Sequence, residues 1–388
     1  MMKNITRRNF LKSTLAATAT GIVFGPLLQA CVPTEHRRIH TAARSSRMRM
    51  RFHAVELEMR HTFTIAGFSR DVCPSIHVEI EYDGMTGYGE GGLPPYMIGQ
   101  TVETASAFLS RIDLSRFHDP FQVEDILAYV DNLEPGMSCA KSAVDIALHD
   151  LIGKLLGIPC HRLFGYNAEK APMTSYTIGI DSEEMIRQKT READPYRILK
   201  VKLGVNEKTD KMLVSTIRSM TDKPIVVDAN QGWRDKHYAL DMIYWLKEHD
   251  VRMVEQPMPK HILDDMAWVT EHSPLPTYAD ESCQRLPDVA RLHGVFHGIN
   301  IKLIKCTGLH EARKMIAAAE ALGMKLMIGC TTESSCALSA AAQIAPRMDF
   351  ADLDGNLLIA NDMFDGMKIV DGKITLNDKP GIGAEPRV

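Results

Sequence analysis

The second half of the chain alternates short apolar segments with stretches of helical periodicity, and this alternation constrains the fold more than any other feature. Helices are expected in the gaps, for example over 184–193, 239–249 and 309–322. The eight apolar segments predicted as strands are 175–178, 198–203, 225–228, 253–255, 277–279, 298–301, 325–328 and 350–352. Strands and helices in strict alternation are typical of an α/β fold with a parallel sheet. The sequence therefore predicts a parallel barrel with an outer ring of helices over 166–360, and an open doubly wound sheet is the alternative.

The residues at the strand ends distinguish the two architectures. Six of the predicted strands carry a charged residue at or next to their carboxyl end, which an ordinary hydrophobic strand does not favour. The leading charges are Lys202, Asp228, Glu255, Asp280 and Lys302, separated by 26, 27, 25 and 22 residues. One strand-helix unit thus separates each charge from the next. Because active sites of barrels lie at the carboxyl ends of the strands, this ring of charges favours the barrel.

Three of these charges are acids on adjacent strands, and they are expected to meet at one mouth. Asp228, Glu255 and Asp280 would repel one another there unless a divalent cation lay between them. An all-oxygen ligand set suits Mg²⁺, one ion per subunit. Each acid taken alone could cap a helix or join a surface ion pair, but three at successive strand ends favour a metal site.

Two lysines flank the acids, one from the second strand of the barrel and one from the sixth. A barrel places these strands across the mouth from each other, so Lys202 and Lys302 are expected to face opposite sides of one substrate. Alternate residues of a strand share a face, which puts Lys200 beside Lys202. The like charge and partial burial are predicted to lower the pKa of Lys202, making it a general base near neutral pH.

The first half of the mature chain has a different texture. Residues 50–82 alternate apolar and polar side chains before the turn Asp83-Gly84, as antiparallel strands do. Helices are expected over 101–112, 121–132 and 139–156. We predict an α+β capping domain over 51–165, and the tail 361–388, with two further short strands, is expected to pack back on it.

The amino terminus has the composition of a targeting segment and not of a folded domain. Arg7 and Arg8 precede an uncharged, mostly apolar run over 13–30, which ends just before Cys31. This pattern resembles a bacterial twin-arginine signal peptide with a lipobox, so we expect 1–30 to be removed, Cys31 to be lipidated and 31–50 to form a tether. The expected location is the periplasm, with membrane contact only through the lipid. A frayed basic helix is the alternative.

Charge and cysteine usage exclude two classes of protein. The net charge is −4, and no basic cluster stands out beyond the first fifty residues, so a nucleic-acid partner is not expected. Removing 1–30 takes away four cations and no acids, which leaves −8. The seven cysteines besides Cys31 are scattered without paired short spacings, so we expect core thiols and no disulfide framework.

Several short motifs together resemble the muconate-lactonizing branch of the enolase superfamily. They are Lys-x-Lys at 200–202, Asp-Ala-Asn at 228–230, Glu-Gln-Pro at 255–257, Asp-Glu-Ser at 280–282, Asn-x-Lys at 300–302, Gly-Tyr-Gly-Glu at 87–90 and the helix 143–150. The resemblance implies a modified TIM barrel of (β/α)7β type with a capping domain. It also implies proton abstraction next to a carboxylate, with Mg²⁺ holding that carboxylate and stabilising the enediolate.

Within this branch, Asp352 and Asp354 on the last strand are similar to the paired acids with which dipeptide epimerases bind the free ammonium of their substrate. This resemblance implies epimerisation of L-Ala-D/L-Glu or a related dipeptide at the α-carbon of its C-terminal residue, by the two bases Lys202 and Lys302. Lys200 is expected to contact substrate as well. As an alternative, the two acids only cap the final loop.

Other positions match places where the family touches substrate, namely Thr177, Thr331 and Glu333. Relatives that act on Ala-Glu carry an arginine in a loop of the capping domain, and Arg70 lies about two positions from the corresponding place. The second side chain of the substrate therefore stays open, since Phe68 would favour an apolar residue. Residues 94–99 are expected to form another lid loop.

An exported enzyme for Ala-Glu dipeptides fits the handling of murein peptides outside the cytoplasm. Rival functions within the branch are an N-acylamino acid racemase, an o-succinylbenzoate synthase and a cycloisomerase, none of which needs two acids on the last strand. A rival from another class is a lipoprotein that binds a metal or a peptide without turning it over. Assembly into a homo-oligomer is left open.

Overall fold

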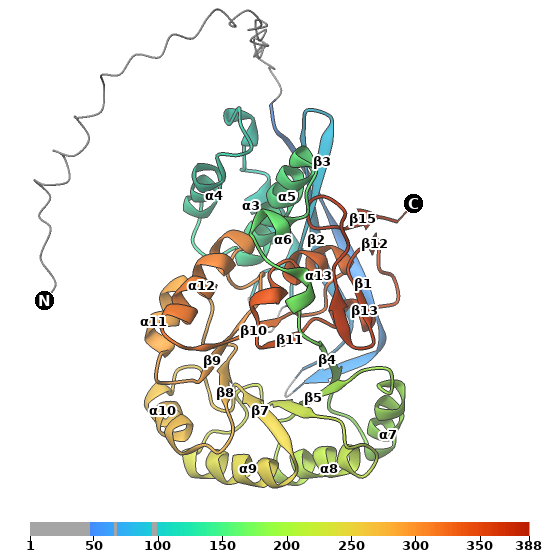
Figure 1. The fold of residues 1–388 in the computed structure, drawn as a ribbon, viewed down its shortest axis with the longest axis vertical. Coiled ribbons are helices and arrows are strands. Elements are labelled where there is room, and N and C mark those ends of the chain that lie inside the picture. Colours follow the sequence, from blue (N-terminus) through green and yellow to red (C-terminus); the bar gives the residue numbers. More distant parts are fainter. Residues whose placement is uncertain (1–46, 66–67, 95–98, 388) are drawn as a thin grey trace, which may run out of the picture. The chain divides into compact units, whose positions relative to one another are not determined.

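A closed barrel of eight parallel strands occupies the second half of the chain (Figure 1). The structure, a computed structural model, describes residues 47–65, 68–94 and 99–387. The barrel strands in order are β4 (Ser175–Ile178), β5 (Ile198–Lys202), β6 (Ile225–Asp228), β7 (Val251–Glu255), β8 (Thr277–Ala279), β9 (Gly298–Ile301), β10 (Lys325–Gly329) and β11 (Phe350–Asp352). A parallel bridge between Thr174 and Ala351 joins the two outer strands. The predicted barrel is confirmed, and the open sheet is excluded.

One helix follows each of the first seven barrel strands, as Figure 1 shows around the strands. These helices are α7 (Glu183–Glu192), α8 (Glu207–Arg218), α9 (Lys236–Glu248), α10 (Leu263–His272), α11 (Leu286–Leu292), α12 (Leu309–Ala321) and α13 (Ser335–Ala342). Local sequence starts several of them: the side chains of Ser182, Asn206 and Asp235 accept hydrogen bonds from the first turns of α7, α8 and α9. Only the short 3-10 helix η4 (Gly355–Leu357) follows β11. This is the expected (β/α)7β arrangement.

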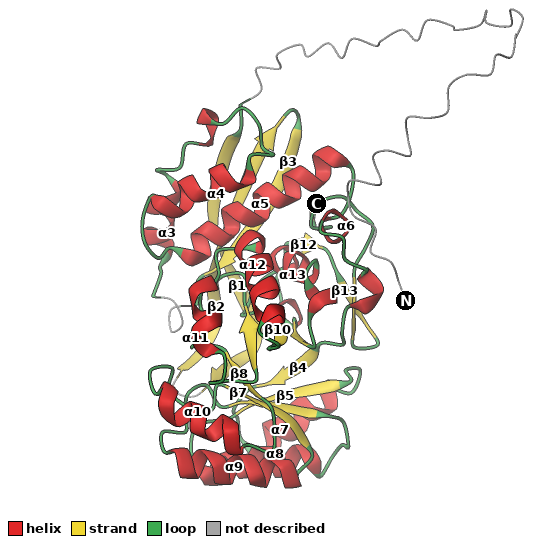
Figure 2. Ribbon diagram, turned by 60° about the vertical axis from the view of Figure 1, so that its left-hand side comes forward, coloured by secondary structure: helices red, strands yellow, loops and turns green. Residues whose placement is uncertain are grey.

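The capping part consists of an antiparallel sheet and helices packed against it (Figure 2). Its strands are β1 (Arg49–Ile65), β2 (Phe68–Tyr82) and β3 (Met85–Gly92), and its helices are α3 (Val102–Leu109), α4 (Val123–Asn132) and α5 (Ser138–Leu156). The alternation that predicted the strands places Ile76, Val78 and Ile80 on one buried face. Burial of this face holds the sheet against α5.

Glycines in β3 allow α5 to lie directly on the sheet. A Cβ atom at Gly87 would stand 2.1 Å from the carbonyl oxygen of Ala147, and one at Gly89 would stand 2.0 Å from that of Ala143. The two glycines are two residues apart on the strand, and the alanines that they face are four residues apart on α5. Side chains at these positions would force the helix away from the sheet, which explains the glycine spacing of the 87–90 motif.

The same helix fastens the capping part to the barrel. Asp145 accepts hydrogen bonds from the backbone N–H groups of Leu309 and His310 at the start of α12, at 2.6 and 3.1 Å. Asp150 accepts from the N–H of Tyr88 at 2.9 Å and from that of Ile382 at 2.8 Å. Buried carboxylates that cap helices and loops need such donors, so α5 ties together β3, the barrel and the tail.

The tail contains four short strands where two were expected: β12 (Phe364–Asp365) pairs with β15 (Glu385–Pro386), and β13 (Lys368–Val370) pairs with β14 (Lys373–Thr375). It contacts the capping part through Asp150 and through the Cys160 N–H, which donates to the Gly381 carbonyl at 2.7 Å. All seven cysteines of the described residues are buried and unpaired, as predicted.

The signal peptide, Cys31 and most of the tether lie outside the described residues. Among the helices that the structure does describe, none combines the length and the apolar character needed to cross a bilayer.

Candidate active site

Three carboxylates meet at the mouth of the barrel, at the carboxyl ends of β6, β7 and β8. Ligand oxygens of Asp228, Glu255 and Asp280 lie within 4.8 Å of one another, and all three side chains are fully buried. Burial raises the pKa of Glu255, and the neighbouring Asp228 raises it further. Oε2 of Glu255 lies 2.6 Å from the ammonium group of Lys200, and Oε1 accepts a hydrogen bond from the Asn300 amide at 2.7 Å. Three buried carboxylates clustered this closely fit a hard divalent cation such as Mg²⁺.

The two predicted bases stand on either side of these acids and line the same cavity, which has a volume of about 440 Å³. Nζ of Lys202, at the end of β5, lies 2.7 Å from Oδ2 of Asp228. Nζ of Lys302, which follows β9, lies 2.7 Å from Oδ2 of Asp280. The three acid-bearing strands separate β5 from β9 in the sheet, so the lysines approach the cavity from opposite sides.

The expected lowering of the Lys202 pKa is wrong. Burial is the largest single influence and acts to lower the pKa of Lys202, as does the charge of Lys200, but the carboxylates of Asp228 and Glu255 together outweigh them and the pKa lies above its usual value. The ion pair with Asp228 is too short for the like charge to dominate. Lys202 and a metal ion would both draw on the Asp228 carboxylate, so the basicity of this lysine is linked to metal binding.

Lys200 lies beneath the cavity and does not line it. Its fully buried ammonium group contacts Oε2 of Glu255 at 2.6 Å, Oδ2 of Asp352 at 2.7 Å and Oδ2 of Asp228 at 3.5 Å. Lys200 was predicted to bind substrate, but its contacts in the structure are to three acids of the mouth. Its positive charge therefore offsets the repulsion between the metal-site acids and the Asp352 carboxylate of the last strand.

The two acids of the last strand both line the cavity but differ in their partners. Asp352 is held by Lys200, by the Ser175 hydroxyl at 2.8 Å and by the Thr177 hydroxyl at 3.3 Å. Asp354 accepts the Thr177 N–H at 2.6 Å. Burial raises the pKa of Asp354 to about 7, and the adjacent Asp352 contributes. Asp354 makes no side-chain cap of the following helix, which argues against the loop-cap alternative.

The remaining predicted residues lie around the rim. Thr177 and Thr331 line the cavity, and the Thr331 hydroxyl has no hydrogen-bond partner among the described residues. Arg70, on β2, also lines it and donates to the Thr332 hydroxyl at 2.5 Å. Glu333 does not line the cavity: its carboxylate accepts the Thr331 N–H at 2.9 Å, and burial raises its pKa to about 7.

Several functional positions were not predicted. Nζ of Lys305 lies 2.6 Å from Oδ1 of Asp280, which it holds from the side opposite Lys302. The spacing Lys302-x-x-Lys305 directly after a barrel strand was a signal that could have revealed it. The aromatic wall of the cavity is Phe63 of β1, and no sequence pattern distinguished it from Phe68. The unpredicted residues of the cavity lining are Phe63, Asn230, Cys330 and Leu358. Of the expected lid loop, 95–98 lies outside the described residues.

Comparison with known families agrees with this geometry. Residues 48–165 match the mandelate racemase/muconate lactonizing enzyme N-terminal domain, and residues 183–387 match the enolase C-terminal domain-like family. The chain belongs to the enolase superfamily. Both domains of the family are thus present in one chain, and the resemblance that the motifs indicated is confirmed.

Individual relatives within the superfamily are epimerases and racemases. The chain is 58% identical to the L-Ala-D/L-Glu epimerase of Bacteroides thetaiotaomicron, over 97% of this chain and 98% of that one. It is 32% identical to the N-succinyl-L-Arg/Lys racemase of Bacillus cereus, over 86% and 93% of the two chains. The crystal structure of a dipeptide epimerase from Enterococcus faecalis with Mg and L-Leu-L-Tyr superposes with a TM-score of 0.81, at 31% identity, covering 87% of this chain and 99% of that one.

Proposed function

We propose that this protein is an Mg²⁺-dependent isomerase that epimerises dipeptides at the α-carbon of the C-terminal residue. The observation that carries the proposal is one cavity lined by Lys202 and Lys302 from opposite sides, with the acid cluster between them. A two-base epimerisation needs a proton acceptor on one face of a carbon and a proton donor on the other. The two lysines supply this pair.

The acids and the lysines have different roles in the proposed reaction. Asp228, Glu255 and Asp280 would hold Mg²⁺, which would supply positive charge to offset the negative charge that develops on the substrate carboxylate as the α-proton leaves. One lysine removes that proton while the other, protonated, returns one to the opposite face. Lys305 and Lys302 fix Asp280 from two sides, which keeps the carboxylate oriented.

Asp354 is the proposed anchor of the substrate ammonium. Its backbone-bonded carboxylate lies on the cavity wall, while Asp352 is already engaged by Lys200 and two hydroxyls. A carboxylate at this place favours a free ammonium group over an amide N–H, because the hydrogen bond is then between two charged groups. The alternative substrates, N-acylated amino acids, have no such group, although the similarity to an N-succinyl racemase keeps that reaction as the rival.

For the substrate we propose L-Ala-D/L-Glu. The relative of 58% identity is an epimerase of this dipeptide, and Arg70 on the cavity wall offers a guanidinium to the glutamate side chain. Such a pair is strong because both partners are charged. Members that act on apolar dipeptides would not need this arginine.

Proton NMR in D₂O tests the reaction directly. The mature protein with Mg²⁺ and L-Ala-L-Glu is expected to lose the α-proton signal of the C-terminal residue and to form the diastereomer. A panel of dipeptides with apolar, basic and acidic second residues ranks the side chains. If N-succinyl amino acids exchanged their α-proton and no dipeptide did, the proposal would be overturned in favour of an N-acylamino acid racemase.

We also propose export by the twin-arginine route, lipid anchoring at Cys31 and a role in the recycling of murein peptides in the periplasm. The support is the sequence pattern of 1–31 alone. Labelling cells with a fatty-acid analogue should mark the wild-type protein in the membrane fraction and leave Cys31→Ala unlabelled. Recovery of unlabelled wild type from the cytoplasm would contradict this.

A further inference from the structure

A second cavity adjoins the active-site cavity. The two cavities border each other at Phe63, Thr177 and Leu358, which line both. A third hollow of about 1090 Å³ shares Arg60 and Tyr176 with the second. The second cavity therefore shares lining residues with both of the other hollows, and the three are here called the row.

The row begins at the position proposed for the amino group of the substrate. The N–H of Thr177 donates to Asp354, and the Thr177 hydroxyl donates to Asp352. Thr177 thus separates the two acids from the second cavity. A dipeptide whose ammonium contacts Asp354 has its amino end beside Thr177, so a group attached to that end would lie next to the second cavity.

The second cavity has features of a binding site. The rings of Tyr176 and Tyr196 stack with centroids 4.5 Å apart and an interplanar angle of 12°. Burial raises the pKa of Tyr176 to about 12, so its hydroxyl stays protonated, and the Arg60 charge acts on the same hydroxyl in the opposite direction. The ring face of Tyr176 and the hydroxyl beside it offer both an apolar surface and a donor.

Arg60 is the charged group that lacks a partner in this row. Its exposed guanidinium makes no hydrogen bond or ion pair with any other residue that the structure describes. The other charged groups of the second cavity are engaged: His61 pairs with Glu192 at 3.2 Å, and Lys189 pairs with Asp181 at 3.0 Å. Arg60 therefore offers its positive charge to a ligand.

We propose that the second cavity binds a residue preceding the dipeptide, so that the enzyme also acts on peptides extended at the amino end, with preference for an acidic first residue. This inference rests on the proposed function. An extended residue spans about 3.3–3.6 Å, and Thr177, which donates its N–H to Asp354, itself lines the second cavity. Asp354 then accepts the N–H of a peptide bond in place of an ammonium, and Arg60 pairs with the acidic side chain. The bond that breaks is still the α C–H of the C-terminal residue.

The test compares three substrates in D₂O with Mg²⁺: L-Ala-L-Glu, L-Glu-L-Ala-L-Glu and L-Lys-L-Ala-L-Glu. We expect kcat/KM for exchange of the C-terminal α-proton to be about 10-fold higher for the acidic than for the basic tripeptide. Arg60→Ala should remove this preference and Arg60→Glu should reverse it, while exchange of the dipeptide changes less than about twofold, because Arg60 does not line the first cavity.

The matched control is Arg252→Glu, which makes the same charge change on an exposed arginine near the start of β7, at the other end of the barrel from the mouth. It should leave all three substrates unaffected. Exchange of the dipeptide with neither tripeptide exchanging overturns the second site and leaves the proposed function intact. Tripeptide exchange that is indifferent to Arg60 overturns the position of the site. Exchange of no peptide at all overturns the proposed function itself.

Discussion

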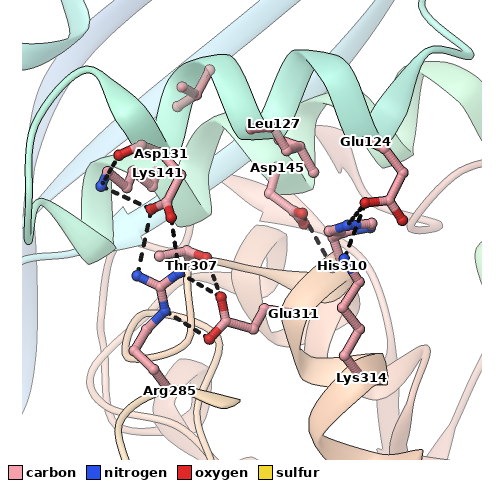
Figure 3. Close-up of a pocket in the computed structure, with 12 residues that line it drawn as sticks. Glu124, Leu127, Asp131, Lys141, Asp145, Arg285, Thr307, His310, Glu311 and Lys314 are labelled. Atoms are coloured by element: carbon pink, nitrogen blue, oxygen red, sulfur yellow. Dashed lines mark hydrogen bonds and ion pairs between the residues drawn. The ribbon is translucent and has the colours of Figure 1, made fainter. Parts of the chain in front are cut away.

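Two clusters of charged residues show what separates a structural ion network from a reactive one. The first, here called the mouth cluster, comprises six carboxylates and four lysines at the barrel mouth: Asp228, Glu255, Asp280, Glu281, Asp352, Asp354, Lys200, Lys202, Lys302 and Lys305. The second, here called the outer network, links α4 and α5 to α12 and to the loop before α11 (Figure 3): Glu124, Asp131, Lys141, Arg285, His310, Glu311 and Lys314.

In the outer network each charge meets its opposite. Arg285 bonds Asp131 from the capping part and Glu311 from α12, and Lys141 bonds Asp131 at 2.9 Å (Figure 3). The network surrounds a hollow of about 540 Å³, and Arg285 and Asp131 are 32% and 44% exposed. Water reaches these pairs, so each contributes little to stability and none has a reason to react.

In the mouth cluster the charges do not balance. Six carboxylates against four ammonium groups leave a formal charge of −2 when all are ionised, which is the charge that one divalent cation offsets. Because these groups are buried, the excess of negative charge raises the pKa of some of the acids. Burial raises the pKa of Glu281 to about 8, with Asp280 contributing. Unbalanced buried charge is costly, and proteins keep it where a ligand or a reaction uses it.

The largest expected effect is on the two lysines. Lys202→Ala and Lys302→Ala should each lower kcat for epimerisation by about 10²- to 10⁴-fold, because a positioned acid or base is lost. Each lysine faces one side of the α-carbon, so each variant should retain α-proton exchange with one epimer and lose it with the other. NMR exchange of the separate L-Glu and D-Glu dipeptides measures this, and equal exchange of both epimers by one variant would contradict opposed bases.

The next largest effect is expected on metal binding, which should depend on the mouth cluster and not on the outer network. Mg²⁺ at 100 times its Kd should stabilise the folded wild type by about 2.7 kcal/mol and raise its Tm. Glu255→Gln should abolish this rise: Oε1 still accepts from Asn300, but the ligand charge is gone. Glu311→Gln makes the same change in the outer network and should keep the response. The measurement is thermal unfolding with and without Mg²⁺, and a Tm rise in Glu255→Gln would place the metal elsewhere.

A smaller effect is expected from Asp354. Its pKa of about 7 means that the carboxylate is lost below neutral pH, so kcat/KM for a dipeptide should fall as pH drops through about 7. Asp354→Asn should raise KM about 10- to 100-fold and remove that limb of the profile, because a charged hydrogen bond is replaced by a neutral one. A pH profile that Asp354→Asn leaves unchanged would assign the limb to another group.

The same shift affects stability with the opposite sign. Because the folded-state pKa of Asp354 is raised, the protonated acid is favoured in the folded protein, and stability is lost as pH rises from about 4 through about 7. Asp354→Asn cannot ionise, so its Tm relative to wild type should be higher at pH 8 than at pH 5. Thermal unfolding at the two pH values checks the sign.

The smallest effect belongs to the outer network. Arg285→Ala should lower the free energy of unfolding by about 1 kcal/mol or less, since its pairs are partly exposed, and the loss should shrink in high salt. Dipeptide exchange should stay within about twofold of wild type. A loss of kcat greater than tenfold would show that the outer network acts on the mouth through the loop that carries Asp280.

The sequence by itself determined the barrel and the position of its chemistry. Strand-helix alternation is a local property, so segments such as 225–228 and 298–301 could be predicted as strands, with the same bounds in the structure. Regular spacing then placed Asp228, Glu255 and Asp280 at adjacent strand ends, because parallel strands leave the barrel at one face. The signal peptide is likewise a local pattern, and it stays a prediction.

Only the tertiary structure decided how these groups act on one another. The pKa of Lys202 depends on a 2.7 Å contact with Asp228, which no spacing along the chain encodes. Lys200 lies under the cavity, Glu333 lies behind its wall, and Phe63 forms part of that wall, because packing between the capping part and the barrel fixes which side of each residue meets the substrate. Electrostatic strength and access vary over a few ångströms, whereas sequence periodicity resolves only the face of a strand.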